Sequence, residues 1–174
     1  MKKKIIWSIV AALGVVIAAL APYAIGQYND MLITKNIMEK GYAVWSIDKE
    51  TAIAIGNESN PAITKAFKGK LAAAYTADTA KEYYQDTLEV TKDDPYPSDN
   101  SFDKVEVVIR WWEGSHQRGN RLTAKFFGYF ETTRDGHTGH ACESTFEVFM
   151  ERTAEGKPWL ISSYTEDDLY PCRG

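Results

Sequence analysis

The chain has 174 residues, a formal net charge of −4, and a residue content that is 44% hydrophobic and 13% aromatic. Lys2, Lys3 and Lys4 are the only charged residues before position 27, so residues 27–174 carry a net charge of −7. An acidic domain of this kind argues against nucleic acid as a partner and against adhesion to anionic lipid through a basic patch. The length of this part predicts one folded domain.

The three lysines are followed by an apolar run, residues 5–21, that contains no charged side chain. Extending the run to Ile25 gives a helix of about 31 Å at ~1.5 Å per residue, which is long enough to cross a bilayer. Trp7 and Tyr23 lie near its two ends, where interfacial aromatic side chains are enriched. We therefore expect residues 5–25 to contact the membrane, with the N-terminus in the cytoplasm and the C-terminal domain outside it.

Cleavage of the same segment as a signal peptide is the alternative. Ala24 and Gly26 have the small side chains and the spacing that a signal peptidase requires. The protein is then either a single-pass protein of the cell membrane or a protein secreted after cleavage near Gly26. The chain divides into a membrane anchor or signal segment (1–26), a helical connector (27–58) and an α+β, cone-like exterior domain (59–174).

Two cysteines, Cys142 and Cys172, occur in the part expected to be exported. An even number of cysteines in an oxidising compartment is typical of a disulfide, so we expect these two to pair. The closed loop would stabilise the fold by about 3 kcal/mol in the chain-entropy model.

Helical signals dominate the first half of the chain. Asp30 can cap a helix over residues 31–40, which Gly41 ends or which simply continues the N-terminal helix. Residues 43–55 fit a strand or a helix that starts at Asp48, and helix is favoured. Asn60 followed by proline is a helix start, and Thr79 with Glu82 can form a capping box for the next helix. The apolar stripes of these last two helices are Ile63, Phe67, Leu71 and Tyr75, then Ala80, Tyr83, Tyr84 and Leu88.

After a polar loop over residues 91–103, the hydrophobic period changes to two. We expect strands beginning at Val105, then over residues 122–133, 139–152 and 159–164, with a turn at 114–120. Helices followed by a run of antiparallel strands predict an α+β fold, with an N-terminal transmembrane helix and helices packed on a curved sheet of about four strands.

One strand register can be argued. A three-residue hairpin loop at residues 134–136 would put Gly136 in the left-handed conformation and pair Phe126 with Ser144. A two-residue turn would place Phe146 opposite Lys125, which is a poorer match. The three-residue loop predicts one inner face made by Ala124, Phe126, Gly128, Phe130, His140, Cys142, Ser144, Phe146, Val148 and Met150.

This order of elements, ending in a strand with Trp159, Leu160 and Ile161, resembles the nuclear-transport-factor-2-like superfamily over about residues 60–164. The resemblance implies a curved sheet wrapped around a helix, with a pocket at the open end of the cone. Scaffold subunits of conjugation machines in that superfamily have one N-terminal anchor, usually behind a longer cytoplasmic tail than this chain has. The SnoaL-like cyclases and isomerases share the fold and use pocket Asp or His residues, but are usually soluble and cytoplasmic.

The candidate ligand-pocket residues lie on the predicted sheet; they are Arg110, Trp112, Phe126, His140 and Ser144. An inward-facing His140 could act as a base or bind an anion. His137 and Cys142 lie close enough in sequence to share a metal with His140, but His137 and His140 would point to opposite faces of a strand, so no metal site is predicted. No catalytic set and no cofactor are expected.

The sequence favours a membrane-anchored, extracytoplasmic binding or scaffold module without catalysis of its own, with a protein partner or a small apolar ligand. One alternative is a SnoaL-like pocket enzyme (isomerase, cyclase or hydrolase) using His140. Another is a scaffold subunit of a secretion or conjugation machine.

Overall fold

The computed structural model describes residues 2–93 and 101–168, and within them the side chains of residues 15–92 and 101–167. This part of the chain is α+β, with helices first and an antiparallel sheet second, as the sequence predicts. The elements are α1 (Lys2–Ala43), α2 (Lys49–Gly56), α3 (Pro61–Ala74), α4 (Ala77–Asp93), β1 (Lys104–Arg118), β2 (Arg121–Arg134), β3 (His137–His140), β4 (Ser144–Glu151) and β5 (Leu160–Asp168).

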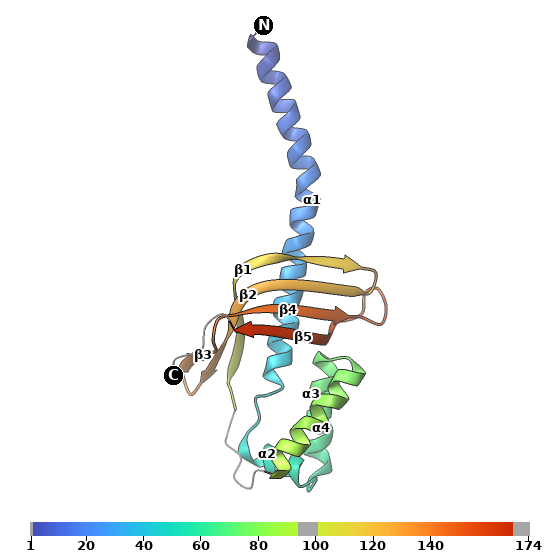
Figure 1. Cartoon of the computed structure of the whole chain (residues 1–174), viewed down its shortest axis with the longest axis vertical. Coiled ribbons are helices and arrows are strands. Elements are labelled where there is room, and N and C mark those ends of the chain that lie inside the picture. Colours follow the sequence, from blue (N-terminus) through green and yellow to red (C-terminus); the bar gives the residue numbers. More distant parts are fainter. Residues whose placement is uncertain (1, 94–100, 169–174) are drawn as a thin grey trace.

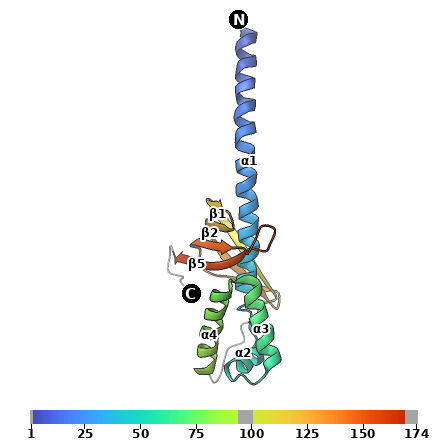
Figure 2. The same ribbon diagram turned by 90° about the vertical axis from the view of Figure 1, so that its right-hand side faces the viewer.

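Helix α1 is one continuous helix of 42 residues with Pro22 inside it. The helix expected over residues 31–40 is therefore its last part, as one of the two predicted alternatives has it. The N-terminal part projects beyond the rest of the molecule, whereas the C-terminal part crosses the sheet (Figures 1 and 2). Thr34, Ile37 and Met38 are buried there. Within residues 15–92 and 101–167, whose side chains are described, no helix is apolar over a length that could cross a membrane.

The predicted helix starts are confirmed in two cases. The Asp48 side chain caps α2, and the Asn60 side chain accepts from the backbone of the first turn of α3, where Pro61 is the first residue. The capping box predicted at Thr79 is wrong, because α4 already begins at Ala77. The Thr79 hydroxyl instead donates to the Ser162 carbonyl of β5 at 2.7 Å.

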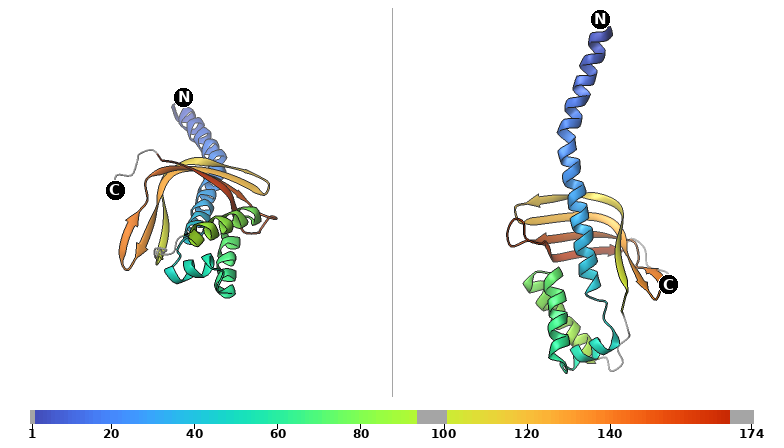
Figure 3. Two further views of the ribbon diagram at one scale, coloured as in Figure 1. Left: turned by 60° about the horizontal axis from the view of Figure 1, so that its bottom comes forward. Right: turned by 180° about the vertical axis from the view of Figure 1, so that it is seen from behind.

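The sheet has the order β1-β2-β4-β5, and β3 pairs with the far end of β2. It curves around the last part of α1, and α2, α3 and α4 lie together at the end of the molecule away from the N-terminus (Figures 1 and 3). Along β2 and β4, buried residues on the inner face mostly alternate with half-buried residues on the outer face. The inner face packs with Phe67 and Leu71 of α3 in one core. Its buried members are Leu122, Ala124, Phe126, Phe130, Phe146, Val148 and Met150.

The predicted three-residue loop at residues 134–136 is wrong. Arg134 pairs directly with His137, so the β2–β3 turn has two residues, Asp135 and Gly136. Both have positive φ angles, 51° and 76°, which is the conformation of the tight turn whose twist matches that of the strands. The register of β3 is consequently shifted by one residue, and His140 pairs with Glu131 instead of Phe130.

An irregular stretch after β3 shifts the register once more. The Ala141 N–H donates to the Phe130 carbonyl at 2.8 Å, and regular pairing resumes with Gly128 opposite Ser144. Two shifts of one residue restore the original alternation, so Ser144 and Phe146 face inward as predicted, although Phe126 pairs with Phe146 instead of Ser144. The predicted third strand is therefore two strands, β3 and β4.

Strand β1 is longer than expected and contains two register shifts, between Ile109 and Trp111 and between Trp112 and Gly114. The first shift turns Trp112 toward the core and leaves Trp111 68% exposed. The strand then continues to Arg118, so the turn predicted over residues 114–120 is much shorter.

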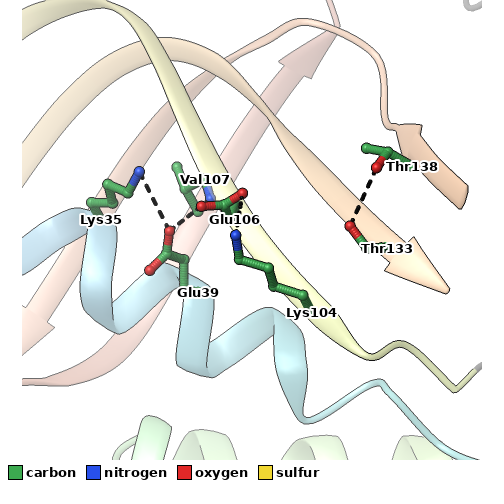
Figure 4. Close-up of polar contacts among 7 residues, drawn as sticks. All are labelled: Lys35, Glu39, Lys104, Glu106, Val107, Thr133 and Thr138. Atoms are coloured by element: carbon green, nitrogen blue, oxygen red, sulfur yellow. Dashed lines mark hydrogen bonds and ion pairs between the residues drawn. The ribbon is translucent and has the colours of Figure 1, made fainter. Parts of the chain in front are cut away.

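Side chains of α1 bind the backbone of β1. The Glu39 Oε1 atom accepts a hydrogen bond from the Val107 N–H at 3.0 Å and lies 3.6 Å from Lys35 Nζ (Figure 4). Further along, the Gln27 side-chain amide donates to the Ser115 carbonyl at 3.1 Å and accepts from the Ser115 N–H at 2.9 Å. These contacts satisfy strand groups that would otherwise be open to pairing with another chain.

Candidate functional site

The interior of the cone is filled by side chains. The space between α1 and the sheet has a volume of about 10 Å³, which is close to the smallest space that holds a single water. Tyr42 stacks on Phe130 with ring centroids 4.1 Å apart, and Tyr75 meets Tyr83 edge to face at 4.8 Å. The residues around this space are Met38, Tyr42, Trp45, Tyr75, Phe130, Ile161 and Tyr164. This part of the cone interior therefore has room for about one water molecule and not for a ligand.

The tyrosines of this interior are held in their neutral form. Burial raises the pKa of Tyr75, and it raises the pKa of the Tyr164 hydroxyl to about 12. The pKa values of Tyr42 and Tyr83 are raised as well, first by burial and then by nearby carboxylates. Groups that stay protonated in this way can donate hydrogen bonds, but they do not act as bases at neutral pH.

The five predicted pocket residues do not come together. Phe126 and Ser144 are fully buried in the core, and Trp112 stacks on Phe126 with 6.4 Å between the rings. His140 is exposed and lies 5.6 Å from the Tyr129 ring on the outer side of the sheet. Arg110 approaches the same Tyr129 ring at 5.3 Å.

The inward position predicted for His140 is thus wrong, and the reason is the two-residue turn. A shift of one residue moves a side chain to the other face of a sheet. His140 is exposed and does not line the space between α1 and the sheet. The described residues therefore do not place it in the enclosed position that the pocket-enzyme alternative requires.

The described residues do not test the predicted disulfide, and they contain no cluster that could bind a metal ion. Cys172 lies outside the described residues, so its disulfide with Cys142 stays a prediction. Within residues 15–92 and 101–167, no three His, Cys, Asp or Glu side chains are grouped so that they could hold a metal ion.

An open groove of about 530 Å³ lies where the end of α1, the second half of α3 and the start of β1 meet. Its floor is formed by small or apolar side chains, and three lysines stand around it. The lining residues are Lys40, Ala43, Val44, Ser46, Lys70, Ala73, Ala74, Phe102, Asp103, Lys104 and Val105. A volume of this size is typical of ligand or peptide sites.

Hydrogen bonds hold the β1 side of the groove in place. The Phe102 N–H donates to the Ser46 hydroxyl oxygen at 2.6 Å, so the strand entrance is joined to the loop after α1. The Asp103 N–H donates to the Thr133 carbonyl at 2.8 Å, and an Asp103 carboxylate oxygen accepts from the Asp135 N–H at 2.8 Å. The one acid of the groove is therefore engaged by the neighbouring turn.

The charge around the groove is positive, although the protein is acidic. Lys40 and Lys70 are exposed, and Lys104 Nζ lies 2.8 Å from Glu106 Oε2 (Figure 4). That hydrogen bond raises the pKa of Lys104 and lowers the pKa of Glu106. Lys104 stays charged, but its charge is shared with Glu106, so Lys40 and Lys70 are the lysines best placed to attract an anion.

Sequence reasoning missed this groove because its residues come from three distant segments. No local motif joins residues 40–46, 70–74 and 102–105. The one signal in the sequence is that the polar face of the predicted helix at Asn60 carries lysines and alanines, among them Lys70 and Ala73.

Neither a family model nor a curated protein sequence matches this chain. Three solved structures are similar to it. The first is CagV, a VirB8 homolog of T4SS from Helicobacter pylori strain 26695, with a TM-score of 0.43, 9% identity, and coverage of 80% of this chain and 99% of that chain.

The second is Bd1075 of Bdellovibrio bacteriovorus, with a TM-score of 0.34, 11% identity, and coverage of 67% of this chain and 36% of that chain. The third is a variant designated Rd1NTF2_05, with a TM-score of 0.30, 16% identity, and coverage of 67% and 90%. At such TM-scores and identities, the three likenesses carry no argument about the family or the function of this chain.

Proposed function

We propose that the protein is a membrane-anchored, extracytoplasmic binding or scaffold module of the nuclear-transport-factor-2-like type, and that it binds a protein partner in the groove between α1, α3 and β1. The observation that carries this proposal is the contrast between two spaces. The space inside the cone beside Tyr42, Tyr75 and Tyr164 measures about 10 Å³, whereas the surface groove measures about 530 Å³.

The anchor is supported by the apolar run over residues 5–25 behind three lysines. Within the described part of that run, the side chains of Val15, Ile17, Leu20 and Ile25 are between 60% and 70% exposed. A continuous exposed apolar helix surface of this kind is stable when lipid surrounds it. The helix α1 then joins the bilayer directly to the folded domain.

The chemistry of the groove favours a peptide segment with carboxylate and small apolar side chains. Lys40 and Lys70 attract carboxylates, and the exposed Ala43 and Ala73 offer apolar contact without large protruding side chains. Charge complementarity of this kind speeds association and selects the partner. Assembly into a secretion or conjugation machine is one form that such a partnership could take.

Photo-crosslinking tests this proposal. A photoreactive amino acid is placed at Ala73, which lines the groove, and a matched one at Ala62, which is exposed on the same helix outside it. In native membranes we expect a discrete protein adduct from position 73 and none from position 62.

The double variant Lys40→Glu, Lys70→Glu should abolish the adduct, whereas Lys81→Glu on α4 should not. Equal adducts from both positions, or an adduct that survives the double variant, would contradict the groove as the binding site. A small-molecule adduct from position 73 would show that the ligand is not a protein.

A further inference from the structure

The contact between α1 and β1 fixes how far one edge of the sheet can lie from a bilayer. Ser115 of β1 binds Gln27 through two backbone hydrogen bonds, and its hydroxyl donates to Asp30 Oδ2 at 2.7 Å. The Trp112 indole N–H donates to Gln27 Oε1 at 3.0 Å. This part of β1 is therefore held to the first turn of α1 that follows residue 25.

The depth of that turn follows from helix geometry once residues 5–25 cross the hydrocarbon core. Gln27 lies about 3 Å, and Asp30 about 7 to 8 Å, beyond residue 25 at ~1.5 Å per residue. The polar headgroup layer on each side of the core is about 5–8 Å thick. Ser115 consequently lies at the depth of the lipid headgroups.

Strand β1 is also the strand nearest the N-terminal part of α1, and the strands run across the helix (Figure 1). Trp112 and Ser115 both bind Gln27, so this part of β1 stays near the same depth, whereas Val107 binds Glu39 and lies further from the bilayer. Strand β5, three strands away, lies about 14 Å further from the bilayer at ~4.8 Å per strand.

The side chains of this edge suit a headgroup layer. Trp111 is 68% exposed, although it is a large aromatic residue next to the core. An indole ring favours the interface, where its apolar body and its N–H both find suitable partners. Arg118 and Arg121 flank the adjoining β1–β2 turn. The Arg121 side chain is 80% exposed, and its Nε atom lies 3.1 Å from Glu151 Oε1 in a surface ion pair that a phosphate can replace.

The opposite edge has the opposite charge. Glu166 and Asp167 are exposed on β5, so the acidic end of the sheet is the end that would point away from anionic phosphates. The net negative charge of the domain argues against general adhesion to lipid, but it does not oppose a local contact made by one tryptophan and two arginines.

We propose that the β1 edge from Trp111 to Arg121 is a second membrane contact, with Trp111 among the phospholipid headgroups of the bilayer that α1 enters. This inference rests on the proposed anchor. Its consequence is a fixed orientation of the domain. The groove at Lys40 then lies about 22 Å along α1 from the hydrocarbon core.

Fluorescence quenching tests the contact. The full chain is reconstituted in vesicles of phosphatidylethanolamine and phosphatidylglycerol that contain a lipid with a spin label on its headgroup. The chain has five tryptophans, so the wild type is compared with Trp111→Phe and with Trp45→Phe, a half-buried residue that follows the C-terminal end of α1. We expect Trp111→Phe to remove at least about twice as much of the quenchable emission as Trp45→Phe.

Flotation of the same vesicles separates the two proposals. If the protein floats with the vesicles but both variants remove equal quenchable emission, the anchor stands and the headgroup contact is refuted. If the protein does not float, the anchor fails and the contact fails with it. Trp111→Tyr serves as a second variant, because it keeps an aromatic ring and the hydrophobic core is not touched by either substitution.

Discussion

Glu39 illustrates how one side chain joins two elements at the residue scale. Its carboxylate accepts from the Val107 N–H, and Val107 is only 1% exposed, so this N–H depends on Glu39 for its partner (Figure 4). Leaving a buried N–H without a partner costs more than the hydrogen bond itself contributes.

Glu39→Ala should therefore lower the free energy of unfolding by about 1–3 kcal/mol. Glu39→Gln keeps an acceptor oxygen and should cost less. Lys35→Ala removes only the exposed ion pair with Glu39 and should cost at most about 1 kcal/mol. Denaturant unfolding measures all three, and an equal effect of Glu39→Ala and Lys35→Ala would contradict the role given to Val107.

The buried tyrosines make the stability of the fold decrease at high pH. The pKa of Tyr164 is raised to about 12 by burial, from 10.0 for an exposed tyrosine. The folded protein therefore keeps this proton where the unfolded chain has lost it. The stabilising effect is complete below pH 10 and is lost as the pH rises through about 12.

We expect the free energy of unfolding to fall between these two pH values, and to fall less steeply in Tyr164→Phe, which cannot ionise. Denaturant titrations at a series of alkaline pH values measure the slope. A variant with the same slope as the wild type would show that Tyr164 is not responsible.

At the scale of elements, β1 and β2 approach each other so closely at Gly128 that no larger residue fits there. A Cβ atom on Gly128 of β2 would collide with the Val108 carbonyl oxygen of β1, which is backbone and cannot rotate away. Gly69 on α3 has open space around it. The same substitution should thus have opposite effects at the two positions.

Gly128→Ala should destabilise the domain by about 3 kcal/mol through forced separation of β1 and β2. Gly69→Ala should stabilise it by about 0.5–1 kcal/mol, since alanine loses less backbone entropy in a helix. Thermal or denaturant unfolding distinguishes them, and a neutral Gly128→Ala would show that the two strands can move apart easily.

The elements themselves could largely be predicted from the sequence, because hydrophobic period and caps are local signals. Asn60 with Pro61 predicted the start of α3, and the period of two predicted the inner face of β2 and β4. What could not be predicted was the position of single residues around irregularities. The turn at Asp135 and the shift before Ser144 each moved the register by one, and these two shifts cancel for Ser144 but not for His140.

The candidate groove could not be predicted, because it depends on how α1, α3 and β1 meet in space. Whether the fold leaves a pocket inside the cone could not be predicted either, because this depends on how large side chains pack there. Tyr42, Tyr75 and Tyr164 fill a space that the fold alone would leave open. Periodicity assigns residues to the inner face, but it does not say whether they leave a cavity.

At the scale of the whole molecule, we propose that α1 stays in the membrane and holds an acidic domain outside it, with the groove about 22 Å along α1 from the hydrocarbon core. The most direct test uses cells whose outer layers have been opened while the cytoplasmic membrane stays intact. These cells are labelled with an amine reagent that cannot cross that membrane. The membranes are then washed at alkaline pH, and the mass of the protein is measured. We predict a chain that stays with the membranes, keeps residues 1–26, and is labelled at Lys65 or Lys70 before lysis. A chain that is released by the wash, lacks those residues, or is labelled only after lysis would contradict the account.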